Sequence, residues 1–447
     1  MSTFKFLKLG FGIVVSFFTG NLFAQDTLHL SVEQAIATAL QNNYDIQLSR
    51  NDSLVTAITY AYRNAAFLPQ LNATGTIISN DNSQSQTYEG GVVKSRSGIK
   101  SHTANAGLSA NWLLFNGFKM FIARNALNDY LEQGSYNIQN QISTTVSDVV
   151  KTYYDIVHQK QLLRSIEEQM TLSSARLQLA QYKLDIGVGI KPDVLQSQID
   201  YNQQRASRVN QLAVIDQRKQ DLNRLMNVRQ TLLYDVGDTI PVDNSLLLSD
   251  ILNSLNQTSP QLLLARKNID VAKINVRLAR ADLYPTVSFT SAYNFARTNN
   301  SSVVNPAFQP LLNTNRGLNY GLTASIPILN NFRTKQEIKQ AELAVNYQQL
   351  VYENQQSTLN RDVLNAYRSY IAQKEIVDIS DSSVSFARQN LYIEKERYRI
   401  GNTTYIELRQ AEQNVAEAET TLITARYNLK LAETDLLRLK GALVRRQ

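Results

Sequence analysis

The sequence contains no cysteine and only three histidines among its 447 residues. Without cysteine the chain has no disulfide, no thiol nucleophile, no iron–sulfur cluster and no cysteine that could carry an N-terminal lipid. The histidines His29, His102 and His158 are scattered, so a histidine-based metal site is not expected. The pair Gly187 and Gly189 lacks the third glycine and the preceding strand of a dinucleotide-binding loop. We therefore expect no enzyme activity, no metal and no cofactor.

The chain also lacks a long apolar run. A short one lies near its N-terminus. Lys5 and Lys8 precede the apolar residues 9–18, and small residues follow up to Ala24. This pattern predicts a secretory signal peptide over residues 1–24, because a membrane-spanning helix needs about 20 apolar residues. Removal of the two lysines lowers the net charge from +7 to +5. So small an excess of positive charge does not favour a nucleic-acid partner.

Glycine and proline are missing from very long stretches. Residues 332–400 and 402–440 contain neither, and residues 119–186 contain only Gly134. Proline breaks helices and glycine weakens them, so these stretches are predicted to be helical. At 1.5 Å per residue the longest of these helices would measure about 100 Å. Because no single globular core is that wide, we expect a coiled coil or an elongated barrel of helices.

Four shorter segments alternate apolar and polar residues, which is the pattern of a strand with one apolar and one wet face. These segments are residues 71–78, 104–115, 286–296 and 318–328. The polar connections between them, residues 79–103 and 297–317, are rich in Asn and Ser. We interpret both connections as exposed loops at the tips of two hairpins.

The two halves of the chain resemble each other. A shift of 214 residues aligns residues 107–227 with residues 321–441 without a gap. We interpret the chain as a tandem duplication in which each unit runs helix, strand, loop, strand, very long helix, tight turn and helix. The predicted division is a signal peptide (1–24), a first repeat (25–227), a linker or equatorial segment (228–260) and a second repeat (261–447).

Four strands are too few to close a barrel, since small barrels need about eight, and an open sheet in lipid would leave unpaired edges. Several chains must therefore combine their strands. The expected fold class is mainly α with a transmembrane β part: an oligomeric outer-membrane β-barrel on a long α-helical barrel or coiled coil.

Several motifs resemble those of the TolC-like outer-membrane efflux proteins. They are AIATALQNNYDIQLSRND (35–52), LPQLNATG (68–75), WLLFNGF (112–118), YKLDIGVGIKPDVLQSQ (182–198) and YRIGNTTYIEL (398–408). The resemblance covers the whole mature chain. It implies a homotrimer in the outer membrane, with a 12-stranded barrel built from four strands per chain and a large periplasmic part. It also implies a passive exit duct that meets a periplasmic adaptor protein and an inner-membrane transporter, and carries small molecules or polypeptides.

The same resemblance implies a gate at the periplasmic tip. Its candidate residues are Asp193, Tyr398, Thr403, Glu407 and Gln410. Thr403 and Gln410 depart from the best-known pattern, which has Arg and Asp at these places. A structural interpretation is also open, because carboxylates such as Asp193 and Glu407 stabilise the first turn of a helix.

The turns themselves contain Gly187 and Gly401, which the resemblance implies as adaptor-docking positions. Their simplest structural role is to end a helix in a left-handed conformation. That role is compatible with docking.

Four aromatic residues of the strands are candidate anchors at the membrane interface: Trp112, Phe115, Tyr293 and Tyr320. Packing inside the protein is the alternative for some of them. For the whole chain the alternative function is a secreted structural or adhesive coiled-coil protein. That alternative would explain the helices and the signal peptide, but not four alternating strands placed symmetrically in a duplication.

Overall fold

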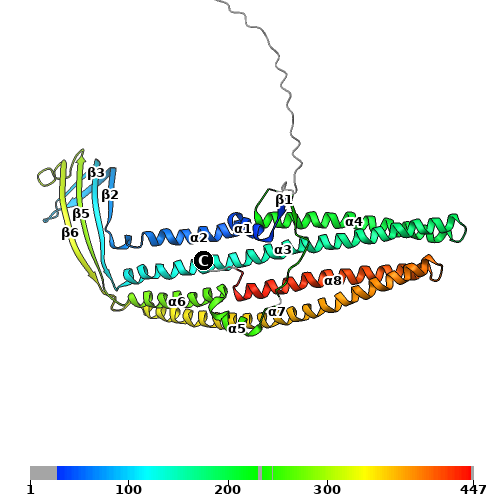
Figure 1. Cartoon of the computed structure of the whole chain (residues 1–447). Coiled ribbons are helices and arrows are strands. Elements are labelled where there is room, and N and C mark those ends of the chain that lie inside the picture. The colour runs from blue at the N-terminus through cyan, green and yellow to red at the C-terminus, as the bar shows by residue number, and fades with distance from the viewer. Residues whose placement is uncertain (1–27, 230–233, 244, 444–447) are drawn as a thin grey trace, which may run out of the picture.

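The computed structural model describes residues 28–229, 234–243 and 245–443. A β-sheet lies at one end of an elongated body, and two helix–turn–helix tips lie at the other (Figure 1). The predicted signal peptide, residues 1–24, lies outside the described residues.

The two halves contain similar elements. The first half consists of β1 (Leu28–Leu30), α1 (Val32–Asn42), α2 (Tyr44–Ala61), a short 3-10 turn (Ala65–Phe67), β2 (Gln70–Thr87), β3 (Val93–Asn116), α3 (Lys119–Asp185) and α4 (Lys191–Met226). The second half consists of β4 (Tyr234–Val236), α5 (Leu248–Thr258), α6 (Pro260–Ala281), β5 (Thr286–Asn300), β6 (Leu312–Ser325), α7 (Arg333–Arg399) and α8 (Tyr405–Lys440).

The long helices expected from the missing glycine and proline are confirmed. Helices α3 and α7 have 67 residues each, and α4 and α8 have 36 each. On α8 the buried apolar residues recur every seven positions, at Leu408, Val415, Leu422, Leu429 and Leu436. A seven-residue repeat is typical of helices that wind around each other as a coiled coil. None of the described helices has an apolar run long enough to cross a membrane.

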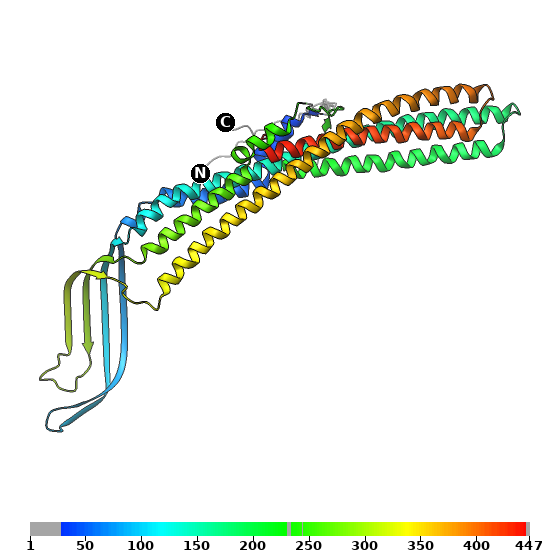
Figure 2. The same ribbon diagram turned by 90° about the horizontal axis from the view of Figure 1, so that it is seen from below.

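The sheet is antiparallel, with the order β2-β3-β5-β6, and it projects from the ends of the helices (Figure 2). The register places Leu108 beside Tyr293, and Tyr293 beside Leu318. Because successive side chains alternate between faces, these three lie on one face, here called the apolar face. Its other large members are Leu71, Ile77, Trp112, Phe289, Phe295, Tyr320 and Leu322. The opposite, polar face has mainly Asn, Thr, Ser and Gly.

The loops at the hairpin tips are shorter in the structure than the sequence predicted. Strand β2 continues to Thr87 and β3 begins at Val93, so most of residues 79–103 is strand. Likewise β5 continues to Asn300 and β6 begins at Leu312, which shortens the expected 297–317 loop. The backbone ladder continues there although the apolar pattern stops, because pairing uses main-chain groups whatever the side chains are.

The last expected strand ends three residues early. Strand β6 stops at Ser325, before Ile326 and Pro327. Proline has no amide hydrogen to donate to a strand ladder, which explains the end of pairing there.

Two clusters of buried residues lie near the middle of the helices. Strand β1 pairs in parallel with β4, whose Val236 is completely buried in one cluster with Ile156 of α3 and Leu222 of α4. A second cluster joins α5 and α6 to α7 and α8 around Tyr370 and Leu436. Part of the expected 228–260 linker is therefore structured, as β4, which packs against the first helical hairpin, and α5, which packs against the second.

The entry from β3 into α3 requires a glycine. Gly117 and Phe118 both have positive φ, at 66° and 67°. A Cβ on Gly117 would lie 2.1 Å from the carbonyl oxygen of Ala281, so no larger residue fits without a shift of the backbone. The equivalent pair before α7, Asn331 and Phe332, repeats the left-handed conformation. The sheet is thus attached to both long helices by the same kind of turn.

Candidate functional site

The two tips of the helical hairpins end in matching turns. Gly187 and Gly401 have φ values of +80° and +83°, and a Cβ on either would meet nothing within 4 Å. In each turn a backbone amide reaches back to the helix, from Val188 to Lys183 O and from Asn402 to Arg397 O, at 3.0 and 2.8 Å. This is a helix C-cap that needs left-handed backbone, so glycine is required by conformation and not by crowding.

The helices after the two turns begin differently. Thr404 caps α8, and its amide donates to a carboxylate oxygen of Glu407 at 2.8 Å, while the amide of Glu407 donates back to the Thr404 hydroxyl at 3.3 Å. The Thr403 hydroxyl also donates to Glu407. These donors lower the pKa of the Glu407 carboxyl to about 2, with the Thr403 hydroxyl as the main cause. Glu407 therefore closes a capping box, which is the structural interpretation that the sequence left open.

Asp193 lies in the first turn of α4 and is half-buried, but it caps nothing, since α4 has no side-chain cap. Gln410 is exposed and donates along its own helix to the Asn414 side chain at 2.9 Å. Both side chains are thus available at the tip for groups from outside the chain.

Tyr398 is buried beside the tip, 4% exposed, in a small cluster with Tyr405 and Leu408. The ammonium of Lys183 lies 3.7 Å from the centre of its ring and donates to its carbonyl oxygen at 2.9 Å. Burial raises the pKa of the Tyr398 phenol, and the nearby charge of Asp193 adds to this. Within the described ranges no hydrogen bond joins Tyr398 to Asp193. In this conformation Tyr398 instead connects the end of α7 to the end of α3.

A buried charge cluster lies further from the tip, and sequence reasoning missed it. Arg176 of α3 donates to Asp200 of α4 at 2.7 Å and also to Glu412 of α8. The Tyr405 hydroxyl donates to Asp200 at 3.0 Å, and Arg409 lies 3.3 Å from the same carboxylate. Three helices therefore meet at one network of ion pairs.

The charges of the cluster depend on one another because the core of the cluster is buried away from water. Arg176, Asp200 and Glu412 are each exposed by less than one tenth. Burial raises the pKa of the Glu412 carboxyl, although the Arg176 charge opposes the rise. In the described part of the chain the Nε of Arg176 has no hydrogen-bond partner.

A repeat in the sequence could have revealed part of this network. Glu412, Glu419 and Glu433 follow the same seven-residue spacing as the buried apolar residues of α8. A carboxylate that recurs at the same spacing as the buried apolar residues of a helix is itself expected to be buried and paired with a cation. Glu419 fits this rule, since it accepts from Ser165 at 2.9 Å and from Arg388 at 2.6 Å.

The four candidate aromatic anchors occupy different surroundings. Trp112 is 41% exposed, and its indole nitrogen donates to the carbonyl oxygen of Phe67 at 2.8 Å. Tyr293 and Tyr320 project from the apolar face, 51% and 76% exposed. Phe115 is half-buried against Phe118, with ring centres 5.0 Å apart. Three of the four are thus free to meet an apolar solvent.

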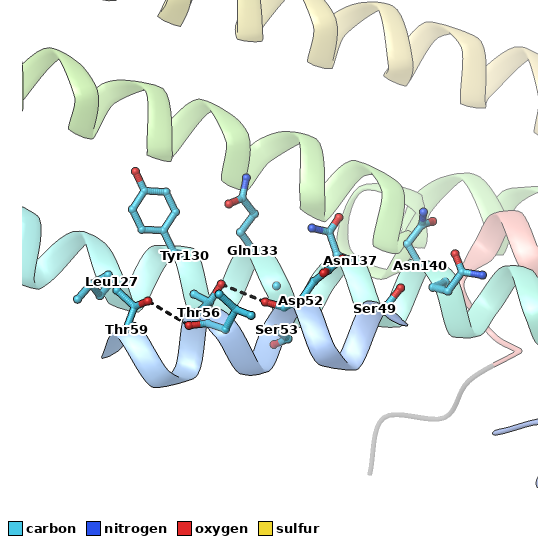
Figure 3. A pocket seen from close by; sticks show the side chains of 13 residues that line it. Ser49, Asp52, Ser53, Thr56, Thr59, Leu127, Tyr130, Gln133, Asn137 and Asn140 are labelled. Carbon is cyan, nitrogen blue, oxygen red and sulfur yellow. Dashed lines mark hydrogen bonds between the residues drawn. The ribbon is translucent and has the colours of Figure 1, made fainter. Parts of the chain in front are cut away.

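A groove with a volume of about 520 Å³ lies between α2 and α3 (Figure 3). Its lining is mostly hydroxyls and amides, with Asp52 as its one carboxylate. The hydroxyls of Thr56 and Thr59 donate back to their own helix at 3.4 and 3.0 Å. The groove accompanies a close approach of the helices, since a Cβ on Gly134 would lie 3.1 Å from the Ser53 hydroxyl.

The chain is similar to known proteins over nearly its whole length. The model of the family described as Outer membrane efflux protein matches residues 35–228 and 251–442. The outer membrane efflux protein BepC of Brucella suis is 20% identical over 425 residues, which cover 94% of this chain and 87% of BepC. The outer membrane protein TolC of Escherichia coli is 22% identical over 380 residues, 80% of this chain and 75% of TolC. The structure of the CmeC outer membrane channel of Campylobacter jejuni has a TM-score of 0.75 at 15% identity, and the match covers 92% of this chain and 85% of CmeC.

Proposed function

The chain belongs to the outer membrane efflux protein family, and on that premise we propose that three copies join their sheets into one barrel. The resemblance found in the sequence motifs is confirmed. The protein is an outer-membrane channel component of an efflux system, with a large periplasmic part. A secreted structural coiled coil, the alternative function, does not account for this membership.

The observation that supports the trimer is the open sheet, which has one apolar and one polar face. Strands β2 and β6 are its edges, and each has a row of unpaired backbone groups. In lipid such groups must be paired, so the sheet has to close with other copies. Because β2 and β6 run in opposite directions, β6 of one copy can pair antiparallel with β2 of the next.

The number three is what the family resemblance implies, and the width of the barrel is compatible with it. Two copies would supply eight strands, and the side chains inside a barrel of that size nearly fill it. Three copies supply twelve strands, three times four, and leave room for a lumen. The apolar face then meets lipid, while the amides and hydroxyls of the polar face line a water-filled duct.

We further propose that the two tips of each chain form a gate and docking surface in the periplasm. Three chains would bring six turns, those at Gly187 and Gly401, to one mouth. Asp193, Tyr398, Thr403, Glu407 and Gln410 would line or support it. An exposed apolar residue beside each glycine, Val188 at 72% and Ile400 at 61%, supports docking of a periplasmic adaptor, which in turn meets an inner-membrane transporter.

The duct is proposed to be passive and without catalytic residues. The equal lengths of α3 and α7, and of α4 and α8, support a tandem duplication with repeats at 25–227 and 261–447 around the segment 228–260. The duplication would let two different hairpins from each chain fill equivalent places around the mouth.

The mass of the purified protein in mild detergent tests the assembly. We expect three chains, and a monomer or dimer would contradict the proposal. Conductance across a planar bilayer tests the gate. The double variant Asp193→Asn with Glu407→Gln should lower the preference for cations, because it removes up to six carboxylates from the mouth. Unchanged selectivity in an intact trimer would place the selective constriction elsewhere.

A further inference from the structure

Charged side chains are distributed unequally over the two faces of the sheet. Along β5, the apolar-face residues from Phe289 to Phe295 are uncharged, and Arg297 follows them. Along β6, Arg316 lies on the same face beyond Leu318, and on β3 Lys100 lies beyond Ala104. Each cation therefore lies toward the end of its strand that is farthest from the helices.

The polar face of the same strands contains no charge up to the register shift between Asn82 and Gln84, beyond which Arg96 and Lys94 pair with Gln84 and Gln86. Its residues from Gln70 to Asn80, Ser101 to Asn111, Ser288 to Asn300 and Asn313 to Ser325, taken alternately, are Asn, Gln, Ser, Thr, Gly, Ala or Ile. Up to this shift the cations are thus not shared by both faces of the sheet. They are confined to the face that otherwise carries Leu, Ile, Phe, Tyr and Trp.

The three cations have no carboxylate partner among the described residues. Arg297 and Lys100 are exposed, and Arg316 lies with its guanidinium 5.5 Å from the centre of the Phe295 ring. Asp81 is opposite Lys100 in the register, yet no ion pair joins them. With one carboxylate against three cations, the face retains a net charge of +2 at this end. The donors of Arg and Lys are therefore free for an outside anion.

We propose that Lys100, Arg297 and Arg316 bind phosphate groups of lipids in the outer leaflet of the outer membrane. The inference rests on the proposed barrel, in which the helices lie in the periplasm and the helix-distal end of the sheet faces outward. A transmembrane strand is about 9–11 residues long. From Trp112 to Ala104 is nine residues. The register places Arg297 beside Ala104 and Arg316 level with Ala106, and Lys100 follows four residues past Ala104, so the three cations lie around the outer end of the apolar span, near the depth of headgroups. Guanidinium and ammonium groups there match the geometry and charge of phosphate.

The proposed occupant is a lipid and not free phosphate, because the cations continue an apolar surface that acyl chains would cover. Arg316 illustrates the combination, since its guanidinium extends over Phe295 while its donors remain available. A lipid can satisfy both parts of the surface at once. Inorganic phosphate can satisfy only the charge.

Binding of diphosphoryl lipid A to the detergent-purified full-length trimer tests the proposal. The thermal unfolding temperature is measured over a titration, because a ligand that binds the folded state raises it. In the triple variant Lys100→Gln, Arg297→Gln and Arg316→Gln we expect the apparent Kd to rise about tenfold, since each cation near a charged lipid surface contributes to binding. Monophosphoryl lipid A should bind the wild type more weakly than the diphosphoryl form, and inorganic phosphate should give no comparable stabilisation.

A matched control removes the same number and kind of charges from the helices. Arg124, Arg266 and Lys335 are exposed and form no described ion pair, so the triple Gln variant at these positions should keep the wild-type Kd. If the sheet variant does not assemble, the single variant Arg297→Gln should still raise the Kd about twofold to threefold.

Three results would overturn the inference: an unchanged Kd in the sheet variant, an equal loss in the helix control, or equal stabilisation by inorganic phosphate. A wild-type protein that is not a trimer by mass would instead overturn the proposed function, and this inference with it.

Discussion

The guanidinium of Arg176 donates to the carboxylate of Glu412, which is 236 residues away in the chain, and both side chains are more than nine-tenths buried. The pair joins α3 of the first hairpin to α8 of the second. Because Asp200 of α4 accepts from the same guanidinium, one arginine holds three helices near the tip. The stability of the tip therefore depends on the buried charge of Arg176, which the apolar pattern of the sequence does not predict.

Removal of this arginine should strongly destabilise the protein. Arg176→Met leaves Asp200 and Glu412 buried without their main partner, and breaking a buried pair in this way costs about 3–5 kcal/mol. The denaturant midpoint of unfolding, followed by circular dichroism, should fall accordingly. Arg164→Met is the control, since its side chain is 80% exposed in a pair with Glu168 and such pairs contribute at most about 1 kcal/mol. Equal midpoints for the two variants would show that the cluster does not stabilise the fold.

The capping carboxylate Glu407 should make stability depend on pH in the acid range. Its pKa in the folded chain is lowered to about 2 from an ordinary value of 4.5. Between these values the unfolded chain binds more protons, so this contribution to stability is complete above pH 4.5 and is lost as the pH falls toward 2. Thermal unfolding at pH 6 and pH 3 should therefore show a smaller decrease for Glu407→Gln than for the wild type. Glu417→Gln, an exposed change on the same helix, should behave as the wild type.

Two glycine substitutions should differ because only one glycine is crowded. Gly187→Ala places a Cβ in open space and costs only the strain of left-handed backbone, about 1–2 kcal/mol. Gly117→Ala has the same strain and in addition a contact of 2.1 Å with the Ala281 carbonyl oxygen. We expect Gly187→Ala to yield trimers with a slightly lower unfolding temperature, and Gly117→Ala to yield little folded protein. Similar yields of both would contradict the close approach at the β3–α3 turn.

A new charge should have different effects at two adjacent residues on opposite faces of β5. Tyr293→Lys puts an ammonium on the apolar face, where a lipid-facing lysine costs about 2–4 kcal/mol at mid-membrane depth, so the variant should be depleted from the outer-membrane fraction. Asn294→Lys puts the same charge on the polar face, and the trimer should persist with its ion preference shifted toward anions. Fractionation and bilayer conductance measure the two effects. Normal membrane levels of Tyr293→Lys would refute the assignment of the faces.

The amino-acid sequence alone predicted the long helices well. The missing glycine and proline over 332–400 predicted α7, which runs from Arg333 to Arg399, because the hydrogen bonds of a helix join residues only four apart in the chain. The alternation of 286–296 likewise located the start of β5, at Thr286. The hydrophobic period is a local property, so local sequence was sufficient.

Other features depended on which helices and strands meet in three dimensions. The charge cluster needs Arg176, Asp200 and Glu412 on three packed helices, and the distance along the chain hides this arrangement. The extra length of β2 and β3 comes from backbone pairing with a partner strand, which polar side chains neither favour nor forbid. The capping box of Glu407 depends on the turn, which brings Thr403 and Thr404 to its carboxylate. Periodicity in the sequence thus determined the elements and marked the buried glutamates of α8, whereas the partners of these polar groups, which lie far away in the chain, were decided by the tertiary structure alone.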